Sequence, residues 1–204
     1  MQGSRPVTLS AHALACRRGD RLLFRGLSFA LESGEAMHVT GANGTGKTTM
    51  IRALAGLTTP YSGSVERAGD IGLLDERTGL DPDLPLGKAL SFWQRIDACS
   101  APSHALATLG LAPLLDVPVR YLSTGQRKRA GLAALLNRGS PIWLLDEPLS
   151  GLDAAAIKQV TALIADHIAG GGIALIASHQ PLAIAGLQSL AIEKFTPVYQ
   201  DERP

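Results

Sequence analysis

The chain has 204 residues, 46% of them hydrophobic, which is sufficient for one domain with a substantial core. Its formal net charge of +1 argues against a large nucleic-acid-binding surface, and no run of about 18 apolar residues is present that could span a membrane. The two cysteines, Cys16 and Cys99, predict unreactive free thiols in a reducing compartment, and residues 1–6 lack the apolar segment of a signal peptide.

The first third of the chain predicts strands and one helix. Residues 7–15 are mostly apolar with polar interruptions, and residues 27–31 alternate between apolar and polar side chains, as strands with one buried face do. Residues 36–40 predict another strand, which leads into a glycine-rich loop, and residues 49–55 predict a helix after that loop. Residues 71–74 predict a short buried strand.

The middle of the chain is predicted to be helical and its end to be α/β. Gly and Pro punctuate a loop at 77–87, and helical spacing follows at 86–96, 105–109 and 126–137. The later elements are apolar runs at 142–145 and 173–177, typical of buried parallel strands, and a helix at 154–169 between them. The predicted organisation is a single domain, with 1–76 and 136–204 forming an α/β core with a β subdomain and 77–135 forming a helical subdomain.

The most informative motif is the run at 41–48, which fits the phosphate-binding pattern G-x-x-x-x-G-K-[ST]. The backbone N–H groups of such a loop and the N-terminus of the next helix together bind an anion. Lys47 would reach the β- and γ-phosphates, and the Thr48 hydroxyl would bind Mg²⁺. A chance glycine-rich turn is the alternative, but the strand before the loop and the helix after it disfavour that alternative. The predicted ATP-binding residues are Gly41, Ala42, Asn43, Gly44, Thr45, Gly46, Lys47, Thr48 and Thr49.

Two carboxylates, Asp146 and Glu147, follow the apolar run at 142–145. Ligands of open α/β sheets bind at the carboxyl edge of the strands, so Asp146 is predicted to hold Mg²⁺ through a water molecule. Glu147 is predicted to orient or deprotonate the water that attacks the γ-phosphate. Taken alone, the pair also fits a surface turn before Pro148.

Two further motifs have a functional and a structural interpretation. Ser123 in Leu-Ser-Thr-Gly-Gln (122–126) is a natural N-cap, and the positive end of the helix behind it could bind a phosphate. An ordinary capped helix with a solvated basic face at 127–129 explains the same residues. His179 follows the run at 173–177 and would lie near a γ-phosphate, although a His at such a place is also common in plain loops.

The chain carries a P-loop (41–48), LSTGQ (122–126), LLDEP (144–148), SGLD (150–153) and SHQ (178–180), in this order. This series of motifs resembles that of the ATP-binding-cassette ATPases, over essentially the whole chain. Residues 14–29, 122–135 and 171–182 are also similar to the ATP-binding subunits of the haem exporters of cytochrome c maturation. The resemblance implies a P-loop NTPase (RecA-like) α/β core with an antiparallel β subdomain and a helical subdomain. It implies hydrolysis of ATP with Mg²⁺, coupled to transport.

The resemblance also implies roles and partners. Glu147 would be the general base, His179 would hold the γ-phosphate, and Asp153 would link the two sites of a head-to-tail dimer. Integral membrane subunits would dock between the core and the helical insertion, which implies that the chain lies on the cytoplasmic face of the bacterial inner membrane. The complex would release a haem-loaded chaperone. The resemblance implies no nucleic acid partner. No Cys-x-x-Cys-His motif is present, so haem follows from the resemblance alone. The residues that would contact ATP bound by the partner copy are Ser123, Gly125 and Gln126.

Three positions depart from the family pattern. Arg18 stands near the place of an adenine-stacking aromatic residue, which predicts weak discrimination between ATP and GTP. Glu76 stands near the place of a Gln and is predicted to contact Mg²⁺, with a solvated acidic loop as the alternative. Thr124 replaces Gly or Ala and is expected to have a modest effect.

Other functions of the chain, and purely structural roles of some residues, remain as alternatives. A soluble cassette ATPase of another assembly process, or the ATPase subunit of a different transporter, would carry the same motifs. A P-loop kinase would not explain LSTGQ, SGLD and His179 together. His38 and Trp143 are predicted core residues, whereas Phe92 and Trp93 either join the core or line the docking groove.

Overall fold

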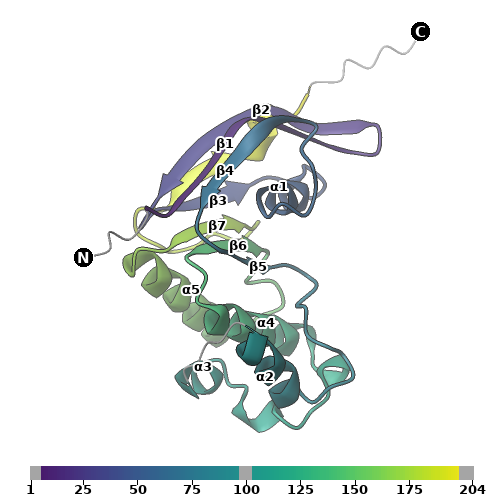
Figure 1. Ribbon diagram of the computed structural model, residues 1–204, viewed down its shortest axis with the longest axis vertical. Coiled ribbons are helices and arrows are strands. Elements are labelled where there is room, and N and C mark those ends of the chain that lie inside the picture. Colours follow the sequence, from purple (N-terminus) through teal and green to yellow (C-terminus); the bar gives the residue numbers. More distant parts are fainter. Residues whose placement is uncertain (1–5, 97–102, 198–204) are drawn as a thin grey trace.

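Two sheets organise the residues that the computed structural model describes, 6–96 and 103–197 (Figure 1). One sheet is antiparallel, with strand order β2-β1-β4, and the other has strand order β5-β6-β7-β3-β8 with every neighbouring pair parallel. The strands are β1 (Thr8–Arg18), β2 (Arg21–Glu32), β3 (Ala36–Thr40), β4 (Ser62–Ala68), β5 (Ile71–Leu74), β6 (Ile142–Asp146), β7 (Ile173–Ala177) and β8 (Gln188–Ala191).

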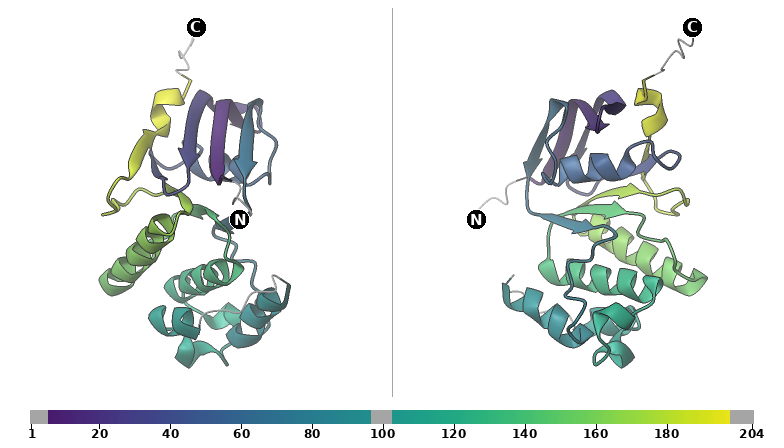
Figure 2. Two further views of the ribbon diagram at one scale, coloured as in Figure 1. Left: turned by 60° about the vertical axis from the view of Figure 1, so that its left-hand side comes forward. Right: turned by 90° about the vertical axis from the view of Figure 1, so that its right-hand side faces the viewer.

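The helices fill the layers around the parallel sheet. Figure 2 shows α1 between the two sheets, with α4 and α5 on the opposite face of the parallel sheet and α2 beyond them. One hydrophobic core accordingly joins the antiparallel sheet, α1 and the upper face of the parallel sheet, and a second core joins its lower face to α2, α4 and α5. The helices are α1 (Lys47–Leu54), α2 (Leu86–Ile96), α3 (Ser103–Thr108), α4 (Thr124–Arg138) and α5 (Ala154–Ala169), with 3₁₀ turns η1 (Ala112–Leu114), η2 (Val119–Tyr121) and η3 (Ile192–Phe195).

The predicted α/β class with a helical segment in the middle of the chain is confirmed. Every residue of β6 and β7 is buried, because helices and strands cover both faces of the central sheet. Since all five strands of that sheet run in the same direction, the segments that follow β5, β6, β7 and β3 emerge at one edge. This edge gathers the predicted functional residues from four separate parts of the chain.

Several local predictions need correction. The first strand continues to Arg18, and α1 begins at Lys47 rather than at 49, because Gly46 in a left-handed conformation ends the loop directly before it. Strands β4 and β8 were not predicted. His38 is half-buried rather than fully in the core, whereas Trp143 is fully buried as predicted.

The structure tests the predictions for Phe92, Trp93 and Cys16, but not the one for Cys99. Phe92 is 47% exposed on α2, while Trp93 is half-buried and donates its indole N–H to the carbonyl of Gly79. Burial raises the pKa of the Cys16 thiol to about 11, which agrees with an unreactive thiol; Cys99 lies outside the described residues. Within the described ranges, no helix combines the length and the apolar character that crossing a membrane requires.

Candidate active site

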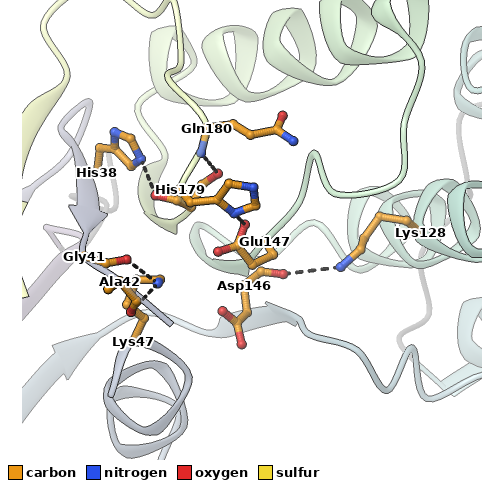
Figure 3. A network of polar contacts seen from close by, with 10 residues as sticks. His38, Gly41, Ala42, Lys47, Lys128, Asp146, Glu147, His179 and Gln180 are labelled. Carbon is orange, nitrogen blue, oxygen red and sulfur yellow. Dashed lines mark hydrogen bonds and ion pairs between the residues drawn. The ribbon is translucent and has the colours of Figure 1, made fainter. Parts of the chain in front are cut away.

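The loop at 41–48 leaves β3 and enters α1 with its amide groups available. Gly46 is the N-cap of α1 with a φ of 109°, and no side chain caps this helix end. No acidic residue lies in the first turn, so the N–H groups and the positive end of the helix dipole are available to an anion. The Lys47 ammonium is buried and donates to the carbonyls of Gly41 and Ala42 at 2.6 and 3.2 Å, which places it within the curve of the loop (Figure 3).

Asp146 ends the buried strand β6 beside this loop. Its side chain is only 4% exposed, and burial raises the pKa of its carboxyl group, while a hydrogen bond from Thr48 and the charge of Lys128 oppose that shift. Its Oδ1 is a buried oxygen without a hydrogen-bond partner. A buried anionic oxygen next to the Thr48 hydroxyl is the donor set that Mg²⁺ takes from proteins, with phosphates and water completing the coordination. The residues present therefore fit this ion.

The donors are few, as Mg²⁺ sites require. Among the residues that the structure describes, no three His, Cys, Asp or Glu side chains lie close enough together to hold a metal ion. An all-protein metal cage is therefore absent from this part of the chain. A site of one carboxylate, one hydroxyl and nucleotide phosphates remains chemically sufficient for Mg²⁺.

Glu147 adopts an uncommon backbone conformation immediately after β6. Its φ of 48° lies in the left-handed region, and its N–H donates to the carbonyl of Ala177 at 2.8 Å. Non-glycine residues keep this conformation only where their surroundings impose it, and such strain is concentrated at active sites. The conformation turns the carboxylate toward His179, whose Nδ1 donates to Glu147 Oε2 at 3.0 Å.

His179 is in turn positioned by the strand next to the phosphate-binding loop. The Nε2 of His38, on β3, donates to the carbonyl of Ser178 at 3.0 Å (Figure 3). His38 therefore steadies the peptide group that precedes His179, a role that its place in an apolar strand did not reveal. The Ser178 hydroxyl also accepts a hydrogen bond from the backbone N–H of Gln180, which further fixes this turn.

A cavity of about 410 Å³ joins these groups. It brings together loop residues, both carboxylates of the Asp-Glu pair, His179, and two positions where the chain departs from the family pattern, Arg18 and Glu76. The predicted site residues that line it are Asn43, Gly44, Gly46, Lys47, Thr48, Thr49, Glu76, Asp146, Glu147 and His179.

The Leu-Ser-Thr-Gly-Gln segment lies elsewhere in the chain's fold and forms a capping box. The amide of Gln126 donates to Ser123 Oγ at 3.2 Å, and the amide of Ser123 donates to Gln126 Oε1 at 2.8 Å. Gly125 packs so closely on Gly151 that an added Cβ would lie 2.6 Å from the carbonyl oxygen of Gly151. Asp153 caps α5 by accepting from the amide of Ala156. The structural interpretation of Ser123 as an N-cap is thus confirmed, and none of these residues lines the cavity.

The expectation that residues 127–129 form a solvated basic face is wrong. Arg127 donates to the carbonyl of Leu122, and Arg129 donates to the carbonyl of Leu109. Lys128 is buried and donates to the backbone carbonyl of Asp146. The sequence does hold a signal for this burial: Lys128 shares the helical stripe of Leu132 and Leu135, which face the core.

Burial lowers the pKa of Lys128, and four carboxylates oppose this shift. In decreasing order of effect, they belong to Asp146, Glu76, Glu147 and Asp75. The ammonium group therefore lies within the electrostatic field of the carboxylates at the ends of β5 and β6, which sequence reasoning missed.

Comparisons with known proteins agree with this geometry. The family model described as ABC transporter matches residues 24–150. The chain is 56% identical over 189 residues to the "cytochrome c biogenesis ATP-binding export protein CcmA" of Novosphingobium aromaticivorans, covering 93% of this chain and 97% of that protein. The protein of the same name from Zymomonas mobilis is 48% identical over 188 residues, covering 92% and 85%.

Solved structures share the fold. A putative ABC transporter ATP-binding protein from Pyrococcus furiosus superposes with a TM-score of 0.80 at 21% identity, covering 93% of this chain and all of that one. A putative metal-chelate type ABC transporter in an inward-facing conformation gives a TM-score of 0.72 at 26% identity, covering 91% and 80%.

Proposed function

The chain belongs to the ABC transporter family of ATP-binding proteins, and from this premise we propose that it is the ATP-hydrolysing subunit of an export complex serving cytochrome c biogenesis. The observation that carries the proposal is the convergence of a phosphate-binding loop, the buried Asp146, the half-buried Glu147 and His179 around one cavity. The names of the relatives from Novosphingobium and Zymomonas support the biological role.

Nucleotide binding is assigned to the loop at 41–49. Its amides and Lys47 would hold the β- and γ-phosphates, and Arg18 at the cavity wall would stack on the purine. Thr48 and Asp146 would hold Mg²⁺, with Glu76 as a further candidate because it lines the same cavity. When bound, this ion supplies positive charge that stabilises the negative charge of the transferring phosphoryl group.

Glu147 and His179 are assigned to the chemical step. Glu147 would orient a water molecule and accept its proton while the water oxygen bonds to the γ-phosphorus and the bond to the β–γ bridging oxygen breaks. His179 Nδ1 donates to Glu147, and when the ring carries a proton on both nitrogens its Nε2 would donate to an oxygen of the γ-phosphate. The products are ADP and inorganic phosphate.

A second copy of the chain is assigned to the other side of the nucleotide. The capped N-terminus of α4, with Ser123, Gly125 and Gln126, carries the positive end of a helix dipole, but these residues are not among those that line the 410 Å³ cavity at the phosphate-binding loop. A head-to-tail dimer would bring it to ATP held by the partner copy. Asp153, whose carboxylate already caps α5, would couple the two sites through the segment that packs on Gly125.

Membrane subunits are assigned to the helical side of the chain. A cavity of about 160 Å³ lies between β5, α4 and α2, and Trp93, Arg77 and Leu135 contribute to its wall. Phe92 and Ile96, also on α2, are exposed apolar residues. We infer that 77–135 acts as the helical subdomain and that 1–76 with 136–204 acts as the core, so that domain movement on ATP hydrolysis reaches the bound membrane subunits. The proposal includes a location on the cytoplasmic face of the bacterial inner membrane, where the chain would bind these subunits.

Haem handling is the most specific part of the proposal. It rests on the similarity of residues 14–29, 122–135 and 171–182 to the ATP-binding subunits of the haem exporters of cytochrome c maturation. The competing functions are a cassette ATPase that serves another assembly process and the ATPase of a different transporter. Both retain the same nucleotide chemistry and differ in the partner that the chain binds. Partner capture therefore separates the three.

The test is a pull-down from native membranes with the Glu147→Gln chain, Mg²⁺ and ATP. This change removes the proton acceptor but keeps the shape of the side chain, so hydrolysis should slow by about 10²- to 10⁴-fold while ATP binding persists. A Lys47→Ala chain, expected to bind ATP poorly, is the matched control.

Recovery of haem-handling membrane subunits with Glu147→Gln, and not with Lys47→Ala, would support the full proposal. Recovery of other membrane subunits, or of soluble partners alone, would retain the ATPase assignment and refute the role in cytochrome c biogenesis. Wild-type chain that releases no phosphate from ATP would refute the assigned chemistry.

A further inference from the structure

Lys128 is a buried cation behind the catalytic carboxylates. Its side chain is 7% exposed, and it extends from α4 toward the end of β6, as Figure 3 shows. A lysine has little reason to be buried unless its ammonium group finds partners, because desolvation of the charge is costly. Lys128 is not among the residues that line the nucleotide cavity, so it acts on that site from outside.

The contact of Lys128 is with a peptide group rather than with a carboxylate. Its Nζ lies 3.4 Å from the carbonyl oxygen of Asp146, and the N–H of the same peptide, which belongs to Glu147, donates to the carbonyl of Ala177. The peptide plane between Asp146 and Glu147 is thus held on one side by α4 and on the other by β7. Both of its polar groups have a partner.

The orientation of this peptide determines where the Glu147 carboxylate points. Glu147 has a φ of 48°, and rotation about this bond moves the side chain relative to the peptide that Lys128 holds. The left-handed conformation costs about 1 kcal/mol or more for a non-glycine residue, so it needs outside restraint. Loss of either hydrogen bond to the peptide would allow Glu147 to relax away from His179.

We propose that Lys128 is a positioning residue for Glu147. Lys128 holds the Asp146–Glu147 peptide so that the Glu147 carboxylate faces the nucleotide cavity and His179. This inference rests on the proposed function of Glu147 in ATP hydrolysis. Lys128 neither contacts the nucleotide nor transfers a proton. Its loss should therefore lower kcat and leave the KM for ATP nearly unchanged.

The first experiment compares steady-state ATP hydrolysis by the wild-type chain and by the full chain carrying Lys128→Met. This change keeps the apolar stem of the side chain and removes the ammonium group. Because a misplacement of about 1 Å can cost about 100-fold in rate, we expect kcat to fall by about 10- to 100-fold with KM changed less than about twofold. Lys128→Arg retains a donor and should recover most of kcat. The matched control, Arg129→Met, removes a cation one residue further along α4 that donates to Leu109, and it should retain kcat.

A second experiment tests whether Lys128 acts through Glu147. In the Glu147→Gln background, adding Lys128→Met should change the residual single-turnover rate by less than about twofold, because residues that act as a unit are non-additive. A full additional 10- to 100-fold loss would overturn the proposal. So would a kcat of Lys128→Met within about threefold of wild type, or a loss confined to KM.

These outcomes are distinct from failure of the proposed function. An inactive wild-type chain, or a Glu147→Gln chain with normal kcat, would refute the assignment of Glu147 before Lys128 is considered. If Lys128→Met fails to fold, as judged by thermal unfolding, the shorter uncharged Lys128→Gln takes its place in both experiments. The expected losses are the same.

Discussion

Replacing Arg18 with alanine is expected to weaken the binding of ATP and GTP slightly and equally. Arg18 ends β1 at the hairpin to β2, is exposed, and lines the nucleotide cavity together with Leu23 and the phosphate-binding loop. A guanidinium group that stacks on a purine interacts with the ring face rather than with the ring edge, where adenine and guanine differ. It therefore contributes affinity without selecting between the two bases.

The magnitude follows from the exposure of Arg18. Stacking of a cation on an aromatic ring contributes about 0.5–1 kcal/mol at exposed sites, which corresponds to about two- to fivefold in Kd for each nucleotide. Arg17 provides a control for charge, because its guanidinium lies 5.3 Å from the ring centroid of Tyr61 and it lines an adjoining cavity, with Thr58 and Asp75, rather than this one. Arg17→Ala removes the same charge and should change Kd by less than about twofold.

The assay is equilibrium titration of the wild-type, Arg18→Ala and Arg17→Ala chains with slowly hydrolysed analogues of ATP and GTP in the presence of Mg²⁺. A wild-type preference for ATP of about 100-fold, or about 2.8 kcal/mol, would refute the reasoning, since stacking at an exposed site cannot supply it. Equal weakening by the two arginine variants would also refute it, because the effect would then come from net charge.

Three further predictions concern other parts of the chain. Glu76→Gln should raise turnover, because it would remove a negative charge near the γ-phosphate, and should raise the Mg²⁺ concentration needed for half-maximal hydrolysis, because it would replace an anionic ligand with a neutral one. An unchanged Mg²⁺ titration would contradict a role for Glu76 at the ion. The His167 ring stacks on Trp143 with 3.8 Å between the ring centroids, and burial lowers the pKa of His167. On acidification, the unfolded chain therefore binds a proton at His167 before the folded chain does. Stability should therefore fall as the pH drops below about 6.5, and denaturant unfolding at pH 8 and pH 5.5 should show a smaller difference for His167→Gln. Gly72→Ala should cost about 1–3 kcal/mol in urea unfolding, because its Cβ would collide with the end of the Leu135 side chain, and less in a Leu135→Ala background.

The strands that the sequence predicted and those that it did not differ in burial. β6 and β7 are covered on both faces, so their residues form continuous apolar runs that are visible in the sequence. β4 lies at the edge of the antiparallel sheet with no fully buried residue, and β8 lies at the edge of the parallel sheet with only Leu190 buried. Both strands pair with a neighbour far away in the chain, β4 with β1 and β8 with β3, and carry little local pattern to detect.

The site shows the same division between local and long-range causes. The phosphate-binding loop could be predicted because phosphate binding requires a fixed spacing of glycine, lysine and a hydroxyl within eight residues of chain. The support of His179 by His38, and of the Asp146–Glu147 peptide by Lys128, depends on partners that only the fold brings together. For each partner, the sequence suggested a simpler role in the core or at the surface.

The buried position of Lys128 also changes the interpretation of Glu76. From the sequence, a carboxylate near the place of a neutral Gln adds negative charge beside the phosphates without compensation. In the structure, Glu76 contributes the second largest of the four carboxylate effects that raise the pKa of Lys128, after Asp146. The charge added at the end of β5 is therefore opposed in part by a buried cation supplied from α4, although Glu76 itself is exposed and water screens the pair. If the two charges act together, Glu76→Gln should raise turnover by a larger factor in the Lys128→Met chain than in the wild-type chain.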